Sequence, residues 1–299
     1  MLLPLGNIMI IGVLGPKGTY TEEAAKLWIE ENSGNEGHIM EYCADIQDVF
    51  ILLESEACDL GVVPLENSIE GSVGVTLDLL LEHDVNIIGE AVVIIEHCLL
   101  SRGKKEDIRI ILSHPQGLGQ CRQFLKDKFP AVELRSTGST SHAAKLATEF
   151  EEMAAIASPE TAGMYDLNIV MPNIQDRKHN HTRFVIITRS NVPESVKKYS
   201  DEQKQDGLYK TSIIVYLDHD RPGALYAILG EFARNDINLT RIESRPSKKV
   251  LGDYVFYIDF EGNINDTIIK HAMFNIKSNV SMLKILGSYP KFDSYCKSN

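Results

Sequence analysis

The segment Asn180–Phe184 places a hydroxyl and a guanidinium side by side where a polar stretch enters an apolar strand. Thr182 can donate a proton or a hydrogen bond, and Arg183 can hold an anion. Because side chains alternate along a strand, Thr182 and Phe184 should face one side and Arg183 the other, unless a twist or bulge brings both polar groups to one ligand. The pattern indicates a site at a strand end, although an ordinary loop-to-strand junction has the same composition.

Three other polar stretches lie at the ends of apolar runs, and glycines punctuate each of them. They are Gly15–Thr21, Pro64–Val73 and Ser113–Cys121. Glycine allows a tight turn between a strand and a helix, and the unpaired N–H groups at a helix start can receive a carboxylate or a phosphate. The glycine spacing of the first stretch fits neither a P-loop nor a dinucleotide-binding motif.

Amide, hydroxyl and imidazole groups in these stretches could orient a polar ligand. Asn67 and Ser68 follow a buried-looking strand, and His114 could act as a general base beside Ser113 and Gln120. Residues 136–141 bring further hydroxyl groups to an expected helix start. Each feature taken alone is equally compatible with helix capping or turn formation.

Hydrolytic and metal chemistry find little support in the sequence. It contains neither the G-x-S-x-G elbow of many hydrolases nor the H-E-x-x-H motif of zinc proteases. His179 and His181 form the only close histidine pair, without a nearby cysteine ligand. We therefore expect no metal site and no cofactor.

The amino-acid composition limits the kinds of molecule that the protein can bind. The 299 residues are 43% hydrophobic and carry a formal charge of −12, with no basic stripe of the kind that binds nucleic acid. Five widely spaced cysteines suggest free thiols in a reducing compartment. The N-terminal residues do not resemble a secretion signal, and no apolar run is long enough to span a membrane. We expect a cytoplasmic protein whose partner is a small anion.

Strands and helices alternate from about residue 8 to residue 190, which is typical of an α/β domain. The strands are expected at 8–14, 60–63, 85–89, 91–95, 109–112, 132–134, 154–157 and 184–188, and the helices at 21–31, 72–82, 118–128 and 141–151. Residues 191–210 are charged and nearly free of apolar side chains, so they read as a linker.

Residues 211–290 are expected to form a second domain in the order β-α-β-β-α-β, which is the ferredoxin-like arrangement. Its strands are expected at 211–217, 237–244, 251–260 and 282–288, and its helices at 223–235 and 265–278. Two turns stand out in it, Asp220–Tyr226 and Asn238–Pro246. Neither offers a nucleophile, and glycine at a helix start suits amino-acid binding rather than chemistry.

Taken in order, these segments resemble the prephenate dehydratase family over about residues 9–290. The resemblance implies a two-lobed catalytic domain similar to periplasmic binding proteins, followed by a regulatory ACT domain that binds phenylalanine. The active site would lie in the cleft between the lobes. Dimers or tetramers would form through the ACT and catalytic domains.

The resemblance also assigns individual residues. The family's catalytic positions correspond to Thr182, Asn67, Ser113 and Gln120 of this sequence. The residues that line the family's substrate pocket correspond to Thr19, Ser68, Thr140 and Arg183. Its effector site falls on Gly223, Ala224, Leu225, Glu243, Ser244, Arg245 and Pro246.

The chemistry of prephenate is consistent with these catalytic and pocket residues. Losing carbon dioxide and water makes the ring aromatic, so an enzyme need only assist the leaving hydroxyl and fix the geometry. We expect Thr182 to donate to that hydroxyl and Arg183, with helix-start amides, to hold carboxylate. Two alternatives stay open, namely arogenate dehydratase and a binding protein that captures an anion without converting it.

Overall fold

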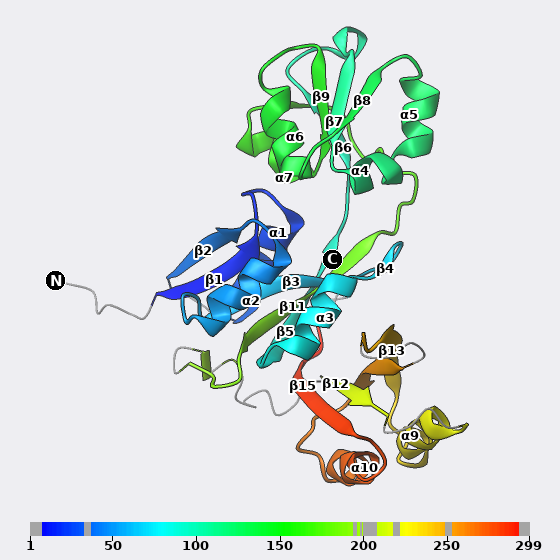
Figure 1. The fold of residues 1–299 in the computed structure, drawn as a ribbon. Helices are drawn as coiled ribbons and strands as arrows, with labels where there is room; N and C mark the ends of the chain where they lie inside the picture. Colours follow the sequence, from blue (N-terminus) through cyan, green and yellow to red (C-terminus); the bar gives the residue numbers. More distant parts are fainter. Residues whose placement is uncertain are drawn as a thin grey trace, which may run out of the picture.

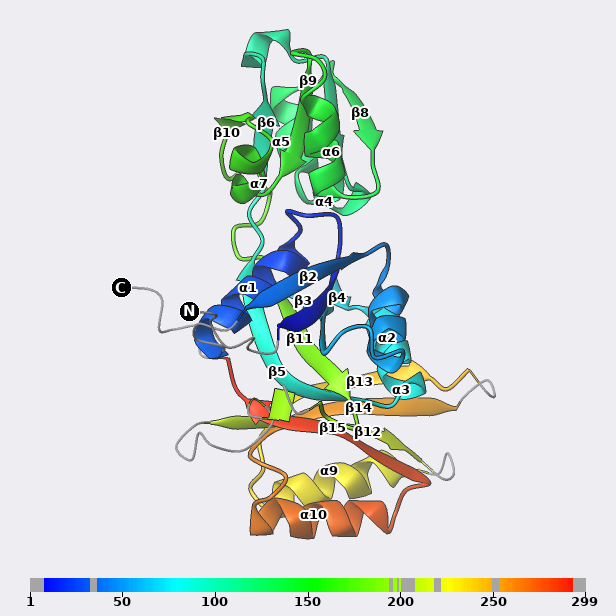
Figure 2. The ribbon, with the colours of Figure 1, turned by 90° about the vertical axis from the view of Figure 1, so that its left-hand side faces the viewer.

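The chain crosses twice between two α/β lobes and then enters a third unit at its C-terminal end (Figures 1 and 2). The computed structural model describes residues 8–32, 37–193, 196–197, 199, 208–217, 222–248 and 253–292. Among these residues, no helix is long and apolar enough to cross a lipid bilayer. The two lobes and the ferredoxin-like unit match the architecture expected from the sequence.

The first lobe is built on a six-stranded sheet. Its elements are β1 (Met9–Leu14), α1 (Tyr20–Asn32), β2 (His38–Cys43), α2 (Ile46–Glu54), β3 (Leu60–Asn67), β4 (Gly71–Ser72), α3 (Gly74–Glu82), β5 (Val85–Ile94) and β11 (His181–Arg189). The strands follow the order β2-β1-β3-β11-β5, and β4 pairs with β3. Helix α1 turns Ala24, Ala25 and Trp28 toward the sheet, because this helical spacing gathers them on one face.

The second lobe has a five-stranded sheet of order β10-β6-β9-β7-β8. Its elements are β6 (Cys98–Ser101), the 3₁₀ turn Lys105–Asp107, β7 (Ile110–Ser113), α4 (Pro115–Gln120), α5 (Arg122–Lys128), β8 (Glu133–Ser136), α6 (Thr140–Ala147), β9 (Met153–Ala157), α7 (Pro159–Met164) and β10 (Asn168–Met171). Small side chains of α6 and β9 allow the helix to pack closely on the sheet.

Two crossovers join the lobes. Residues 95–97 carry the chain from β5 to β6, and residues 172–180 return it from β10 to β11. Strand β11 then enters the first sheet between β3 and β5 and runs antiparallel to both. The polar ends of β3 and β11 therefore lie at the crossovers, next to the space between the lobes.

The C-terminal domain has the β-α-β-β-α-β order predicted from the sequence. Its elements are β12 (Tyr209–Tyr216), α9 (Ala224–Arg234), β13 (Leu239–Pro246), β14 (Tyr254–Glu261), α10 (Thr267–Lys277) and β15 (Met282–Pro290). The sheet order is β13-β14-β12-β15. Both helices cover the sheet face that points away from the first lobe, and the other face packs on that lobe (Figure 2).

This packing joins the two domains through one apolar core. Val63, Leu77, Ile214 and Tyr289 belong to a single cluster of buried side chains. Strand β15 approaches β5 so closely that a Cβ atom on Gly287 would lie 2.1 Å from the carbonyl oxygen of Ile87. Such contact requires glycine at this position.

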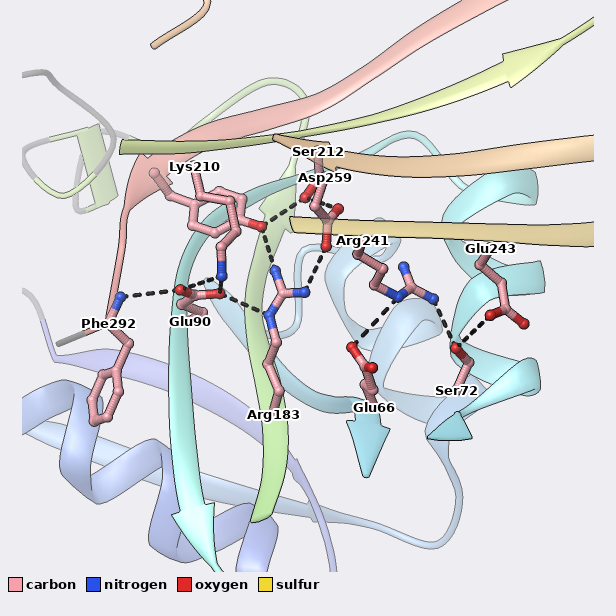
Figure 3. A network of polar contacts seen from close by, with 11 residues as sticks. Glu66, Ser72, Glu90, Arg183, Lys210, Ser212, Arg241, Glu243, Asp259 and Phe292 are labelled. Atoms are coloured by element: carbon pink, nitrogen blue, oxygen red, sulfur yellow. Dashed lines mark hydrogen bonds and ion pairs between the residues drawn. The ribbon is translucent and has the colours of Figure 1, made fainter. Parts of the chain in front are cut away.

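A buried ionic network lies in the same interface (Figure 3). Arg183 donates to Glu90 at 2.7 Å, to Asp259 at 2.6 Å and to the Tyr289 hydroxyl at 2.8 Å. Lys210 donates to both oxygens of Glu90 at 2.8 Å. Burial acts to raise the pKa of Asp259, but the charges of Arg183 and Arg241 and the hydrogen bonds from Arg183 and Ser212 together lower that pKa. The network therefore pairs two cations with two anions across the domain boundary.

Several elements differ from those predicted. The sequence did not predict β2, α2, β6, α7 or β10, and the strands expected at 85–89 and 91–95 form one continuous strand. The helix expected at 118–128 is divided at Cys121, and the one expected at 141–151 ends at Ala147. Part of the expected linker is described. Within it, Val196 is buried against the first lobe, and Tyr209 and Lys210 already belong to β12.

The network makes a prediction about stability. Arg183→Leu should lower the free energy of unfolding by about 3–5 kcal/mol in urea, because it leaves Asp259 as a buried charge without its main partner. The matched control is Arg135→Leu, which removes an exposed partner of Glu133 and should leave the urea midpoint nearly unchanged. Similar small effects for both variants would contradict a structural role for Arg183.

Candidate active site

A cavity of about 740 Å³ lies between the lobes, beside the crossovers. This volume is within the range of roughly 300–1,000 Å³ that is usual for small-molecule sites. The first lobe contributes Thr19, Asn67, Glu70, Ser72 and Thr182 to its lining, the second lobe contributes His114, Gln120 and Thr140, and the first crossover contributes His97. We call this space the cleft cavity.

Strand pairing places the two central polar residues of the cleft cavity. Thr182 on β11 is the register partner of Asn67 at the end of β3. Both side chains are almost buried, with exposures of 8% and 5%. The pairing register between β11 and β3 shifts after Arg183, yet Thr182 and Phe184 still line the cavity and Arg183 points to the opposite face.

Hydrogen bonds fix the direction in which Asn67 acts. Its Oδ1 accepts from the backbone amides of Ile69 and Glu70 at 3.0 and 3.1 Å. Its Nδ2 must therefore donate, and it reaches Thr182 Oγ1 at 2.9 Å and Asn180 Oδ1 at 2.7 Å. Because Thr182 Oγ1 accepts this bond, its own hydroxyl proton remains available to a ligand.

The amide chain continues into the second lobe. Asn180 Nδ2 donates to Gln120 Oε1 at 2.9 Å, and Gln120 Nε2 donates to Glu70 at 3.0 Å. With that orientation, Gln120 Oε1 can only accept, so His97 Nε2, 2.8 Å away, is the donor. The chain thus connects both lobes and both crossovers to Thr182.

His97 closes this chain as a neutral imidazole. Its side chain is buried, and its Nδ1 has no hydrogen-bond partner among the described residues. Burial lowers the pKa of His97, partly offset by the bond to Gln120. His97, which lines the cleft cavity, therefore has an acceptor nitrogen, Nδ1, that makes no hydrogen bond to the described residues.

Helix starts, rather than cations, supply positive potential. In the described part of the chain, no lysine or arginine lines the cleft cavity. Helix α6 begins there at Thr140, and α3 begins beside it at Gly74 without a side-chain cap on its first turn. Their unpaired amides can receive a carboxylate. No group of three or more His, Cys, Asp or Glu side chains with metal-binding geometry occurs among the residues described.

Five of the eight predicted catalytic and pocket residues line the cavity, namely Thr19, Asn67, Gln120, Thr140 and Thr182. Three do not. Ser113 is fully buried, donates to the Ile156 carbonyl and lies directly under Gly117, so it supports α4 from below. Ser68 binds the second crossover through the backbone of His179 and His181.

The expectation that Arg183 holds carboxylate in the pocket is wrong. The guanidinium is committed to the interdomain network, because the alternation of strand side chains directs it away from the cleft cavity. Sequence reasoning also missed three members of the amide chain, Asn180, Glu70 and His97. A histidine two residues after the apolar run 91–95 is a local signal that could have indicated the last of these.

The predicted effector residues occupy two elements of the C-terminal domain. Gly223 has a left-handed φ of 86° and precedes α9, where Ala224 and Leu225 form the first turn. On β13, Glu243 and Arg245 bind the first lobe, whereas Ser244 and Pro246 face the opposite, exposed side. The two charged side chains thus contact the other domain and not an open pocket.

Comparisons with known proteins decide the family. The family model described as prephenate dehydratase matches residues 11–192, and the ACT domain model matches residues 211–269. The chain belongs to the prephenate dehydratase family. The first match covers nearly all of the segment 8–190 and extends two residues beyond it, and the second lies within the segment 211–290.

Individual relatives agree with this assignment. The prephenate dehydratase of Methanocaldococcus jannaschii is 43% identical over 281 residues, which cover 93% of this chain and 97% of the relative. An arogenate dehydratase/prephenate dehydratase of Arabidopsis thaliana is 35% identical over 95% of this chain and 72% of its own length. The crystal structure of prephenate dehydratase from Arthrobacter aurescens in complex with L-Phe superposes with a TM-score of 0.80 at 32% identity, covering 95% of this chain and 90% of that one.

Carboxyl groups from both lobes meet near the first crossover. Burial raises the pKa of Glu23 on α1 to about 7, and repulsion from Glu160 on α7 and Glu96 in the crossover adds to the rise. Charging Glu23 therefore places a partly buried negative charge near Glu160 of the second lobe and Glu96 of the crossover.

This group predicts a pH dependence of stability. Because the folded pKa of Glu23 is about 7 and its ordinary value is 4.5, its contribution to stability is lost as pH rises between them. Glu23→Gln should therefore gain stability over the parent as the pH is raised from about 5 to about 8 in thermal unfolding. Glu41→Gln on the exposed edge strand β2 is the control. A difference from the parent that stays constant with pH would contradict this assignment.

Proposed function

We propose that this chain is a prephenate dehydratase, which converts prephenate to phenylpyruvate, carbon dioxide and water and is inhibited by L-phenylalanine bound to its ACT domain. The observation that carries the proposal is the polarity of the amide chain. Asn67 donates to Thr182 Oγ1, so the threonine proton is directed to a ligand in the cleft cavity.

The reaction needs a donor at the leaving oxygen. The bond between the ring carbon and the hydroxyl breaks as Thr182 donates a hydrogen bond to that oxygen, and a proton taken up from solvent completes the water that leaves. The bond between the ring and its carboxylate breaks in the same process, and its electron pair completes the aromatic ring. The amide chain holds Thr182 in place for this donation.

Among the described residues no lysine or arginine lines the cleft cavity, and this supports decarboxylation. The ring carboxylate loses its charge as carbon dioxide forms, so a strong ion pair would stabilise the substrate more than the transition state. The pyruvyl carboxylate keeps its charge, and the start of α6 at Thr140 can hold it through backbone amides. Arg183 takes no part in binding in this proposal.

Arogenate dehydration is a second candidate. Arogenate carries an ammonium group where prephenate carries a keto oxygen. The cleft cavity is lined by Asp45, Glu70 and His97, and among the described residues no lysine or arginine lines it. Such a lining suits an ammonium group.

The proposal extends to a cytoplasmic homodimer or homotetramer. The ACT domain exposes large apolar side chains on its helices, with Tyr226 on α9 79% exposed and Phe274 on α10 71% exposed. Exposed apolar side chains of this size favour contact between copies of the domain.

The activity is tested by mixing the purified protein with prephenate and following phenylpyruvate by its absorbance in alkali, with and without millimolar phenylalanine. Arogenate is assayed in parallel through phenylalanine formation. Prephenate turnover that phenylalanine suppresses supports the proposal. Turnover of arogenate alone would change the substrate, and turnover of neither would favour an anion-binding protein.

Thr182→Val should lower kcat for prephenate by about 10²–10⁴, because it removes the donor and keeps the shape of the side chain. Thr182→Ser keeps the hydroxyl and is the matched control, which should retain most of the activity. A valine variant with a rate within about threefold of the parent would contradict the role of Thr182.

Asn67→Asp tests the polarity of the chain. A carboxylate still accepts from the amides of Ile69 and Glu70 but cannot donate to Thr182, so the threonine proton turns toward the new carboxylate. We expect kcat to fall by about 10² or more, with a smaller change in KM. Asn168→Asp on the exposed strand β10 is the control. Unchanged kcat in Asn67→Asp would show that the direction of this bond is unimportant.

A further inference from the structure

Two residues of strand β13 in the ACT domain contact Ser72, which lines the cleft cavity (Figure 3). Residues 70–75, which we call the rim segment, include five residues that line the cavity. Arg241 donates to Ser72 Oγ at 3.0 Å, and Ser72 in turn donates to Glu243 at 3.1 Å. One hydroxyl on the cavity wall is therefore held between two side chains of the other domain.

The same strand also holds the helix that follows the rim segment. Arg245 donates to both carboxylate oxygens of Asp78 on α3, at 3.0 and 3.2 Å. Its guanidinium lies so close to Gly74 that a Cβ atom there would be 2.7 Å from it. At the far end of α3, Lys284 donates to the carbonyls of Leu80 and His83. Both ends of α3 are thus fixed by the ACT domain.

The two faces of β13 have different environments. Side chains alternate along the strand, so Arg241, Glu243 and Arg245 face the rim segment and α3. The intervening residues face the opposite side, where Ile242 is 45% exposed. The side chains on this outer face of β13 are exposed, so a ligand can reach them although the helices cover other parts of the same sheet face, and the strand backbone connects the two faces.

Arg241 contacts Ser72 but leaves one of its own donors without a hydrogen bond. The side chain is only 7% exposed, yet its Nε finds no hydrogen-bond acceptor among the described residues. Glu66 Oε2 lies 3.5 Å from this nitrogen, just beyond a good charge-assisted hydrogen bond. A shift of β13 would change the distances from Arg241 to Glu66 and to Ser72 together, because one guanidinium contacts both residues. A displacement of the strand therefore changes the wall of the cleft cavity.

We propose that Arg241 and Glu243 are positioning residues for the reaction, which hold Ser72 and the rim segment in the active geometry, and that phenylalanine on the outer face of β13 inhibits by shifting this hold. The inference deepens the proposed function and rests on it. The buried Arg183 network is the fixed part of the interface, because its donors and acceptors are paired and it lies away from the cavity.

The experiment compares three variants of the full chain, Arg241→Gln, Glu243→Gln and Ser72→Ala. Prephenate turnover is measured over a range of phenylalanine concentrations, and phenylalanine binding is measured by calorimetry without prephenate. We expect the phenylalanine concentration for half inhibition to rise at least about tenfold in each variant, while the calorimetric dissociation constant changes less than about threefold. Lys248→Gln removes an exposed contact to Asp78 and is the matched control, expected to behave as the parent.

A double variant isolates the contact itself. If Arg241 acts through Ser72, Arg241→Gln combined with Ser72→Ala should shift inhibition no further than either change alone. Ser72→Ala also tests the contact from the catalytic side without altering the ACT domain, so the test survives if a β13 variant fails to fold.

The outcomes separate this inference from the proposed function. A parent that does not convert prephenate contradicts the proposed function, and a parent that converts it without inhibition contradicts both the regulation and this inference. In an inhibited parent, unchanged inhibition in all three variants would overturn the positioning role. Equal losses of binding and inhibition would also overturn it, since the residues would then be ligand contacts.

Discussion

The insertion of β11 between β3 and β5 is the constraint on which the other features depend. This strand returns from the second lobe and becomes an interior strand of the first, so its side chains alternate between two buried environments. Thr182 faces the cleft cavity, and its neighbour Arg183 faces the ACT domain. One backbone segment thus fixes both the proposed donor in the cleft cavity and an ionic contact of the domain interface.

The sequence predicted the features that depend on local chemistry. Apolar runs indicated most strands of the first sheet, and polar stretches after β3 and at the start of β11 indicated Asn67 and Thr182. The alternation of side chains along a strand also predicted that Arg183 faces away from Thr182, but its guanidinium and the family resemblance together led to an expected role in holding carboxylate. Only the position of Asp259, which is 76 residues further along the chain, shows why an arginine occupies this place.

Other elements could not be predicted because their signals are weak or nonlocal. Strand β2 is an edge strand with mostly exposed side chains, so it lacks the apolar run of a buried strand. Strand β6 and helix α7 are short and owe their stability to packing in the second lobe. His97 and Asn180 form hydrogen bonds with Gln120, which is distant from both in sequence, so neither segment shows which partner these side chains have.

Buried ionic contacts hold the catalytic and ACT domains together. The catalytic and ACT domains are separate in sequence, yet Glu90 receives hydrogen bonds from Arg183, Lys210 and the backbone of Phe292, which lie in or near three different strands. Neither domain can leave the other without exposing a charge that was matched only in the pair. Although the two domains are classified separately, we therefore expect each to depend on the other for its stability. An exchange of ACT domains between relatives would have to keep the ionic partners on both sides of the interface matched.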